Sequence, residues 1–299
     1  MTREEFLETK YQEYRKNHWD AHKSFFKNAA VGRFEPFKMS DNIWYVGDTY
    51  VCVHLIDTGD GLILIDSGYI GATHLLTDTI WRAGFDPKNV KWIIHSHGHY
   101  DHFGASNDFK HMYGTKLAIS RVDGEGIAEY PERAHIDYKV FPYAEVPEFD
   151  LLLDDGEVFE LGNTRIRCVL TPGHTIGVMT YFFNTTWEGK EYVAATFGGA
   201  GVGAVTLPHT THNKFPADLP YQMLESIDRV MGETVHIQLG NHPGNNDTLG
   251  KREKQLREGG NPFLSPSGDA WRTFLESLKK SVYDHIEINK QLEKEMENL

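Results

Sequence analysis

The segment "HSHGHYDH", residues 95–102, places four histidines and one aspartate in eight positions. Histidine is the commonest nitrogen ligand of zinc and the usual proton carrier near neutral pH. Residues two apart in an extended segment point to the same side, so His97 and His99 can bind one ion together. Asp101 and His102 can face a neighbouring point. These residue types at this spacing predict a metal site.

Two further histidines follow strand-like segments later in the chain. His174 in "LTPGHTIG" and His242 in "IQLGNHPGN" each lie on a turn with proline and glycine. A zinc ion takes about four ligands, one of them an open position in a catalytic site, so residues 95–102 alone are too few for two ions. We therefore expect His174 and His242 to complete the site. The alternatives are turn histidines bonded to backbone and an Asp101 that caps a following helix.

The motifs His-x-His-x-Asp-His, Pro-Gly-His and Asn-His-Pro together resemble those of the metallo-β-lactamase superfamily, from about residue 33 onward. The segments "LGNHPG" and "NPFLSPSGDAWRTFLE" look most like the third subclass of true metallo-β-lactamases. This resemblance implies an α/β fold, the four-layer αββα sandwich of the metallo-β-lactamase type. It also implies two Zn²⁺ ions, the first bound by His97, His99 and His174 and the second by Asp101, His102 and His242.

The resemblance also implies roles in catalysis. Asp66, in "LIDSG", matches an aspartate that supports the metal site in much of the superfamily, where such a carboxylate orients a ligating imidazole. The alternative for Asp66 is an ordinary turn residue. Zinc lowers the pKa of bound water from about 15.7 to about 7, so that a metal-bound hydroxide can attack a carbonyl. Asp101 would be the catalytic residue, orienting this hydroxide and passing its proton to the departing atom. With a site charge of about +2, we expect a small-molecule substrate that bears a carboxylate.

Two departures from the superfamily pattern bear on the substrate. Glyoxalases, lactonases and nucleases of the superfamily usually carry a metal-bridging aspartate where this chain has residues 197–199, Phe-Gly-Gly. The metals would then be bridged by water or hydroxide alone, which resembles the β-lactamase branch. The serines that help to hold the β-lactam carboxylate in the third subclass are not evident in "GGAGVGAV". The leading hypothesis is a zinc hydrolase that opens a β-lactam; alternatives are lactone or thioester hydrolysis and a non-catalytic metal-binding protein.

Strand-like segments rich in β-branched and aromatic residues alternate with helical ones along both halves of the chain. Such a pattern predicts two sheets packed face to face, with helices outside. The expected strands are "NIWYVGD", "YVCVHLIDTG", "GLILIDSG", "VKWIIHS", "TKLAIS", "TRIRCVLT", "VMTYFFN", "EYVAATF" and "VHIQLG".

Helices are expected at residues 2–30, 73–85, 218–231 and 269–299. Thr2 and Glu5 have capping-box spacing, and an aromatic stripe predicts a helix that covers the core, with a lid over the pocket as the alternative. We divide the chain into an N-terminal helical extension, 1–30, and a metallo-β-lactamase-like domain, 31–299, that includes the C-terminal helix. That helix is expected to pack on the body, with a homo-oligomer contact as the alternative.

The remaining histidines and cysteines favour structural roles. Cys52 and Cys168 lie in apolar segments and predict small buried residues rather than a disulfide. His95, on the strand side of the cluster, is expected to be buried and hydrogen-bonded. His209 and His212, in "LPHTTH", fall in an expected loop without partner acids and favour a pocket-wall or surface role. The glycine-rich "FGGAGVG" lacks the Lys and Ser/Thr of a phosphate-binding loop and predicts a tight turn near the metals.

Composition bounds the class of protein. The 299 residues are 40% hydrophobic and 24% charged, as in an ordinary globular protein. A net charge of −13 argues against nucleic-acid binding, and no run approaches the roughly 18 apolar residues of a membrane span. The N-terminal "MTREEFLETKYQEYRKNH" is too charged for a secretory signal. We therefore expect a cytoplasmic protein, or a periplasmic or secreted one if an export signal was removed.

Overall fold

The computed structural model describes residues 1–297 and 299. The first helix, α1 (Arg3–Lys27), begins with the predicted capping box. The Thr2 hydroxyl accepts a hydrogen bond from the Glu5 N–H at 3.2 Å, and the Glu5 carboxylate accepts one from the Thr2 N–H at 2.8 Å. The helix ends at Lys27 rather than at residue 30, and a 3₁₀ turn follows.

The first sheet contains seven strands in the order β1-β2-β3-β4-β5-β6-β7. The first four strands pair antiparallel, whereas β4 to β7 are parallel. The carboxyl ends of the parallel strands therefore meet at one edge, which is where the segments after β4 and β5 lie. The strand bounds are β1 Phe37–Lys38, β2 Ile43–Tyr45, β3 His54–Asp57, β4 Leu62–Ile65, β5 Val90–Ile94, β6 Lys116–Ser120 and β7 Leu151–Leu153.

The second sheet contains five strands in the order β12-β11-β10-β9-β8. All neighbours pair antiparallel except β11 and β12, which are parallel. The nine strands expected from the sequence are present, and β1, β7 and β8 are additional. The bounds are β8 Val158–Leu161, β9 Thr164–Leu170, β10 Met179–Trp187, β11 Lys190–Thr196 and β12 Ile237–Leu239.

The two sheets pack face to face around a shared apolar core, to which Ile63 and Ile94 of the first sheet and Ile166 and Tyr181 of the second contribute. Helices α2 (Thr73–Arg82) and α3 (Ser106–Tyr113) cover the outer face of the first sheet, where Ile80 and Phe109 are buried against its strands.

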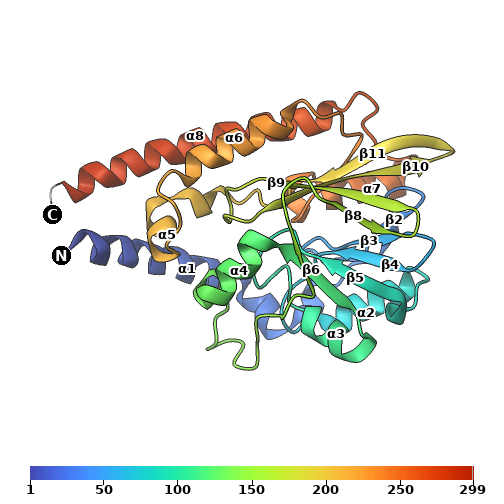
Figure 1. The fold of residues 1–299 in the computed structure, drawn as a ribbon, viewed down its shortest axis with the longest axis horizontal. Helices are drawn as coiled ribbons and strands as arrows, with labels where there is room; N and C mark the ends of the chain where they lie inside the picture. The colour runs from blue at the N-terminus through green and yellow to red at the C-terminus, as the bar shows by residue number, and fades with distance from the viewer. Residues whose placement is uncertain (298) are drawn as a thin grey trace.

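Helices α6 (Leu219–Met231) and α8 (Asp269–Met296) cover the outer face of the second sheet. Figure 1 shows these helices and the pair α2 and α3 on opposite sides of the two sheets. The predicted four-layer αββα sandwich is therefore confirmed.

The structure differs from the expected helices in further respects. Helix α2 ends at Arg82 rather than at residue 85, and Gly84 beyond it has a φ of 94°. Helix α8 ends at Met296, before the expected residue 299, and residue 298 lies outside the described residues. Four helices were not expected from the sequence, namely α3, α4 (Arg121–Glu129), α5 (Leu207–His212) and α7 (Thr248–Glu258). Helix α4 contains two glycines, which have low helix propensity. It is nevertheless capped, because the Ser120 hydroxyl accepts a hydrogen bond from the Asp123 N–H at 3.1 Å.

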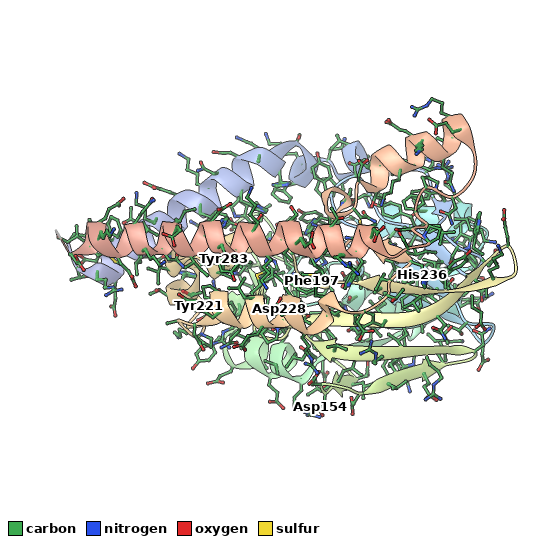
Figure 2. The ribbon with its side chains drawn as sticks, turned by 90° about the horizontal axis from the view of Figure 1, so that it is seen from above. Asp154, Phe197, Tyr221, Asp228, His236 and Tyr283 are labelled. Carbon is green, nitrogen blue, oxygen red and sulfur yellow. The ribbon has the colours of Figure 1, made fainter. Side chains whose placement is uncertain are left out.

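The C-terminal helix packs on the body as predicted, since Leu275, Leu278 and Val282 are buried in the cluster that joins α8 to α6 and the second sheet. Lys279 on α8 also forms an ion pair with Asp228 on α6, and Figure 2 shows the two helices side by side. An oligomer contact through α8 stays a prediction. None of the described helices is both long and apolar enough to cross a membrane.

Truncation of Trp271 should test the packing of α8. Its side chain is fully buried, and its indole N–H donates to the Val230 carbonyl at 3.0 Å. We expect Trp271→Ala to lower the free energy of unfolding by about 3–5 kcal/mol, measured by urea denaturation. Tyr283→Ala is the control on the same helix, because Tyr283 is 52% exposed, and should cost no more than about 0.5 kcal/mol. Equal losses for the two variants would contradict this packing.

Candidate metal centre

All six predicted metal ligands lie just after strand ends at one edge of the sandwich. The turn after β5 carries four of them, and single histidines follow β9 and β12. The structure brings their ligand atoms together in two groups, within 4.8 Å of one another in each group. The first group is His97, His99 and His174, and the second is Asp101, His102 and His242. The grouping is the one expected from the sequence, while metal binding by these residues stays a prediction.

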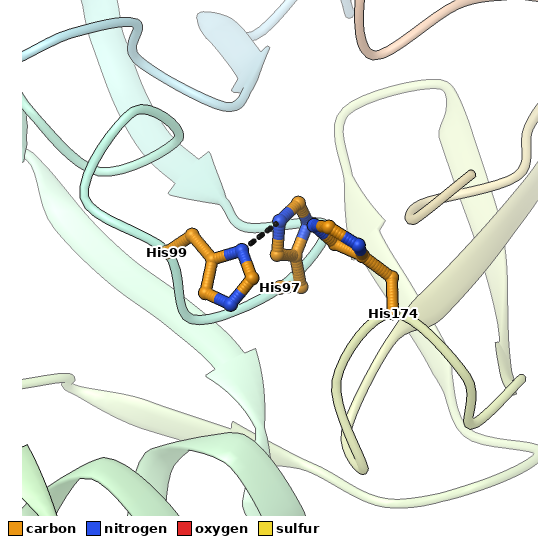
Figure 3. Close-up of side chains that lie close together, drawn as sticks. All are labelled: His97, His99 and His174. Carbon is orange, nitrogen blue, oxygen red and sulfur yellow. Dashed lines mark hydrogen bonds between the residues drawn. The ribbon is translucent and has the colours of Figure 1, made fainter. Parts of the chain in front are cut away.

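The first group consists of three imidazoles at close range. His97 Nε2 lies 3.2 Å from His99 Nδ1, and the ring of His174 lies 4.7 Å from that of His97 and 4.6 Å from that of His99, between centroids. Figure 3 shows the three rings converging from two separate loops. His97 and His99 are buried. An all-nitrogen set of this kind suits zinc.

The second group combines one carboxylate with two imidazoles. Asp101 Oδ2 lies 3.5 Å from His102 Nε2 and 3.6 Å from His242 Nε2. His102 Nε2 is buried and has no hydrogen-bond partner within the described part of the chain. A buried polar atom left without a partner costs about 1–3 kcal/mol. A metal ion between these atoms would satisfy it, so the residues present fit a second cation.

Backbone carbonyls orient three of the imidazoles. Each ring donates its Nδ1–H group to a carbonyl oxygen. His97 donates to Gly198 at 2.8 Å, His174 to Gly201 at 2.7 Å, and His242 to Tyr50 at 2.8 Å. With Nδ1 protonated, the Nε2 atom of each ring keeps its lone pair for a metal.

The glycine-rich turn after β11 allows this close approach. A Cβ atom at position 201 would lie 2.6 Å from the His174 ring, and one at position 198 would lie 2.1 Å from the Met179 carbonyl oxygen. The sequence prediction of a tight turn near the site is therefore confirmed. Phe197, just before these glycines, is buried in the core of the second sheet. The turn at residues 197–199 thus presents no carboxylate to the two groups.

Asp66 supports the fourth imidazole, as the sequence resemblance implied. Its carboxylate accepts hydrogen bonds from His102 Nδ1 at 2.8 Å and from both the backbone N–H and the hydroxyl of Ser96 at 2.7 Å. Asp66 has a φ of 64°, which is uncommon for a non-glycine residue. Strain of this kind costs about 1–3 kcal/mol and concentrates at functional sites.

Burial and local charge determine the protonation of both groups. Burial lowers the pKa of His97 and His99 well below the usual range, so these imidazoles are neutral and able to bind a cation. Burial opposes charge on Asp101, but the neighbouring His102 and His242 outweigh it and lower the pKa of the carboxyl. Burial also opposes charge on His102, whose pKa is nevertheless raised by Asp101 and Asp66. The second group therefore keeps an ionised carboxylate.

Asp123 is a supporting residue that sequence reasoning missed. It is buried on α4, and its carboxylate accepts hydrogen bonds from the Gly98 N–H at 2.8 Å and the Thr175 hydroxyl at 2.6 Å. Gly98 lies between two ligands of the first group, and Thr175 follows the third. Asp123 thus joins the two ligand loops. Its only signal in the sequence was the capping relation to Ser120.

A cavity of about 290 Å³ lies over the two groups and is lined in part by α1. Tyr14, Arg15, His18 and His22 of α1 form one wall, while Phe25 of the same helix is buried in the core. The favoured prediction, a helix that covers the core, was therefore incomplete, because α1 also encloses the cavity, which is closer to the alternative of a lid over the pocket. The aromatic stripe alone could not separate these two roles.

The expected loop around His209 and His212 is helix α5 instead. The prediction that it lacks a partner acid was wrong, because His212 Nδ1 lies 2.8 Å from the carboxylate of Glu8 on α1. His212 also stacks on Tyr11, with ring centroids 3.7 Å apart. His209 is 3% exposed and lines the cavity, as predicted for a pocket wall.

The predictions for His95, Cys52 and Cys168 are confirmed. His95 is buried, and its ring nitrogens lie 2.8 Å from the Ala118 carbonyl and 2.7 Å from the Ser106 hydroxyl. Cys52 and Cys168 are both buried and free.

Removal of His242 should separate the two groups. Loss of a residue that only hydrogen-bonds a metal ligand weakens metal binding roughly 10–100-fold. We expect His242→Ala, which removes a predicted ligand, to weaken the binding of one metal ion by more than this, while the first group stays occupied. Metal content and competition with a chromogenic chelator measure both affinities. The control is His111→Ala, which removes an exposed histidine from α3. Equal weakening of both ions, or none, would show that His242 is wrongly assigned.

Comparison with known proteins agrees with this geometry. Residues 46–185 match the model of the metallo-beta-lactamase superfamily. The subclass B3 metallo-beta-lactamase BJP-1 of Bradyrhizobium japonicum superposes with a TM-score of 0.77 at 25% identity, over 87% of this chain and 96% of the other. The metallo-beta-lactamase FEZ-1 of Legionella gormanii gives a TM-score of 0.76 at 28% identity, over 87% and 98%.

Curated relatives match over shorter stretches. A probable metallo-hydrolase of Burkholderia pseudomallei is 36% identical over 99 residues, and a hydroxyacylglutathione hydrolase of Acidiphilium cryptum is 28% identical over 94 residues. Each match covers 31% of this chain and 31% of the relative, so the chain spans about a third of their length. The motifs, the two groups of ligand atoms and the shared fold agree with the family match, which identifies residues 46–185 as similar to the metallo-beta-lactamase superfamily.

Proposed function

We propose that this metal-dependent hydrolase binds two Zn²⁺ ions and opens a cyclic amide, the β-lactam ring, of a small molecule that bears a carboxylate. When bound, the two ions would supply a hydroxide nucleophile near neutral pH and polarise the substrate carbonyl. The proposal of a β-lactam substrate rests on the turn at residues 197–199, which places no bridging carboxylate between the two groups. The fold shared with subclass B3 enzymes supports the same choice.

Asp101 is the group best placed to handle a proton in this reaction. Its Oδ2 atom faces both histidines of the second group, and its lowered pKa keeps it ionised at neutral pH. A carboxylate there can orient the attacking nucleophile and then carry a proton to the departing nitrogen. Asp66 and the backbone carbonyls of the turn hold the neighbouring imidazoles in place during this transfer.

A second candidate is hydrolysis of a lactone or thioester by the same residues. The cavity receives Gly201 from the glycine-rich turn and none of the serines that hold a β-lactam carboxylate in the third subclass. The match to a hydroxyacylglutathione hydrolase supports this candidate. A non-catalytic metal-binding protein is the third candidate, which the complete set of six ligand residues disfavours.

Asp101→Asn should keep the fold but reduce turnover. The amide has nearly the same shape, yet it cannot carry the negative charge that orients the nucleophile and accepts the proton. We expect kcat to fall by about 10²–10⁴-fold, measured with a chromogenic substrate at saturating zinc, where metal analysis shows that the ions remain bound. An unchanged kcat would remove Asp101 from the mechanism.

A substrate panel tests the proposed activity directly. We expect a chromogenic cephalosporin and a carbapenem to be hydrolysed faster than an acyl-homoserine lactone or a glutathione thioester. Chelation should abolish the reaction, and added zinc should restore it, because the bound ions would supply the hydroxide nucleophile. A lactone or thioester rate well above every β-lactam rate would overturn the proposal in favour of the second candidate.

A further inference from the structure

One side chain of α1 brings a fixed positive charge to the cavity over the metal centre. Among the described residues that line this cavity, Arg15 is the one arginine or lysine. The other lining side chains are histidines, tyrosines and the carboxylate of Asp101. For an anionic group of a substrate that lies away from the metal ions, Arg15 is therefore the positively charged side chain with which it can pair in this cavity.

The charge of Arg15 is not neutralised by an ion pair within the described part of the chain. Its Nη2–H donates to the backbone carbonyl of His135 at 3.0 Å, and its guanidinium lies over the Trp19 ring, 5.4 Å from the centroid. Neither partner is an acid. A guanidinium has five N–H donors in a fixed fork, which match a carboxylate in a bidentate arrangement. The side chain is half-buried, so donors remain accessible from the cavity.

The anchor of Arg15 is joined to the metal centre. His135, whose carbonyl holds the guanidinium, stacks its ring on His99 of the first group, with centroids 4.3 Å apart and planes at 19°. Trp19 in turn packs on Tyr100, 5.8 Å between centroids, beside Asp101. The guanidinium is thus held at a defined place relative to both groups of ligands, rather than on a freely moving surface arm.

We propose that Arg15 is a specificity-determining residue that binds the carboxylate of the substrate. This inference rests on the proposed function, because it takes a carboxylate-bearing substrate from it. It assigns to α1 a task that the glycine-rich turn at residues 198–203 cannot perform, since that turn offers no hydroxyl or charged side chain. Charge-assisted hydrogen bonds to an arginine fork supply both affinity and orientation.

The test compares one substrate with and without its charge. A chromogenic cephalosporin and its methyl ester are hydrolysed by the zinc-loaded full chain, and the ratio of kcat/KM for acid to ester is measured. We expect Arg15→Gln to lower this ratio by about 10–100-fold, mainly through KM for the acid. Arg15→Lys should retain part of the preference, because the charge stays while the fork is lost.

Lys16→Gln is the matched control. It removes one positive charge from the next position of the same helix, where Lys16 is exposed and does not line the cavity over the metal centre. The acid-to-ester ratio should equal that of the wild type. The inference is overturned if Arg15→Gln lowers both rates equally, if Lys16→Gln has the same effect, or if the wild type does not distinguish acid from ester.

Failure of the proposed function gives a different result. If the wild type hydrolyses neither compound, calorimetry measures binding of the acid and the ester to the zinc-loaded proteins. A preference of the wild type for the acid that Arg15→Gln loses would support the role of Arg15 while the proposed β-lactam hydrolysis fails. No preference in the wild type would overturn both.

Discussion

The hydrogen bond that each orienting Nδ1–H group donates is the interaction on which the rest of the site depends. His97, His174 and His242 donate to backbone carbonyls, and His102 donates to Asp66. Without this acceptor, the imidazole ring could rotate, or its proton could move to the nitrogen that faces the predicted metal ion. Because the acceptors belong to different loops, the centre exists only where several strand ends are held in register at one edge of the sandwich.

This requirement explains local choices that secondary-structure propensity alone would disfavour. Glycines at positions 198 and 201 allow the turn to pack closely, because a side chain at 201 would collide with the His174 ring and one at 198 with the Met179 carbonyl. Asp66, just after β4, has a strained backbone conformation, and its carboxylate accepts three hydrogen bonds that hold it there. Asp123 links the two loops of the first group from a helix that contains two glycines. The buried polar network thus determines backbone conformation around the site.

The strands and the long helices were predictable because their apolar patterns are strong and local, and the six ligand residues were predictable because their spacing is specific. Helix α4 was missed because its glycines weaken the helical signal, and α5 because six residues beginning Leu-Pro resemble a loop. The contact of Glu8 with His212 joins residues far apart in sequence, so no local pattern contains it. The wall formed by Arg15 and His18 also depends on tertiary packing.

Helix α1 lines the cavity yet supplies none of the six ligand residues, which all follow strands of the two sheets. It is attached through contacts of its own, such as the pair of Glu8 with His212 and the burial of Phe25. In the proposed function, substrate selection by α1 and catalysis by the residues after the strands would therefore belong to separate parts of the chain. Substitutions of Tyr14, Arg15 or His18 could then change the substrate range while the loops that carry the six predicted ligands stay constant.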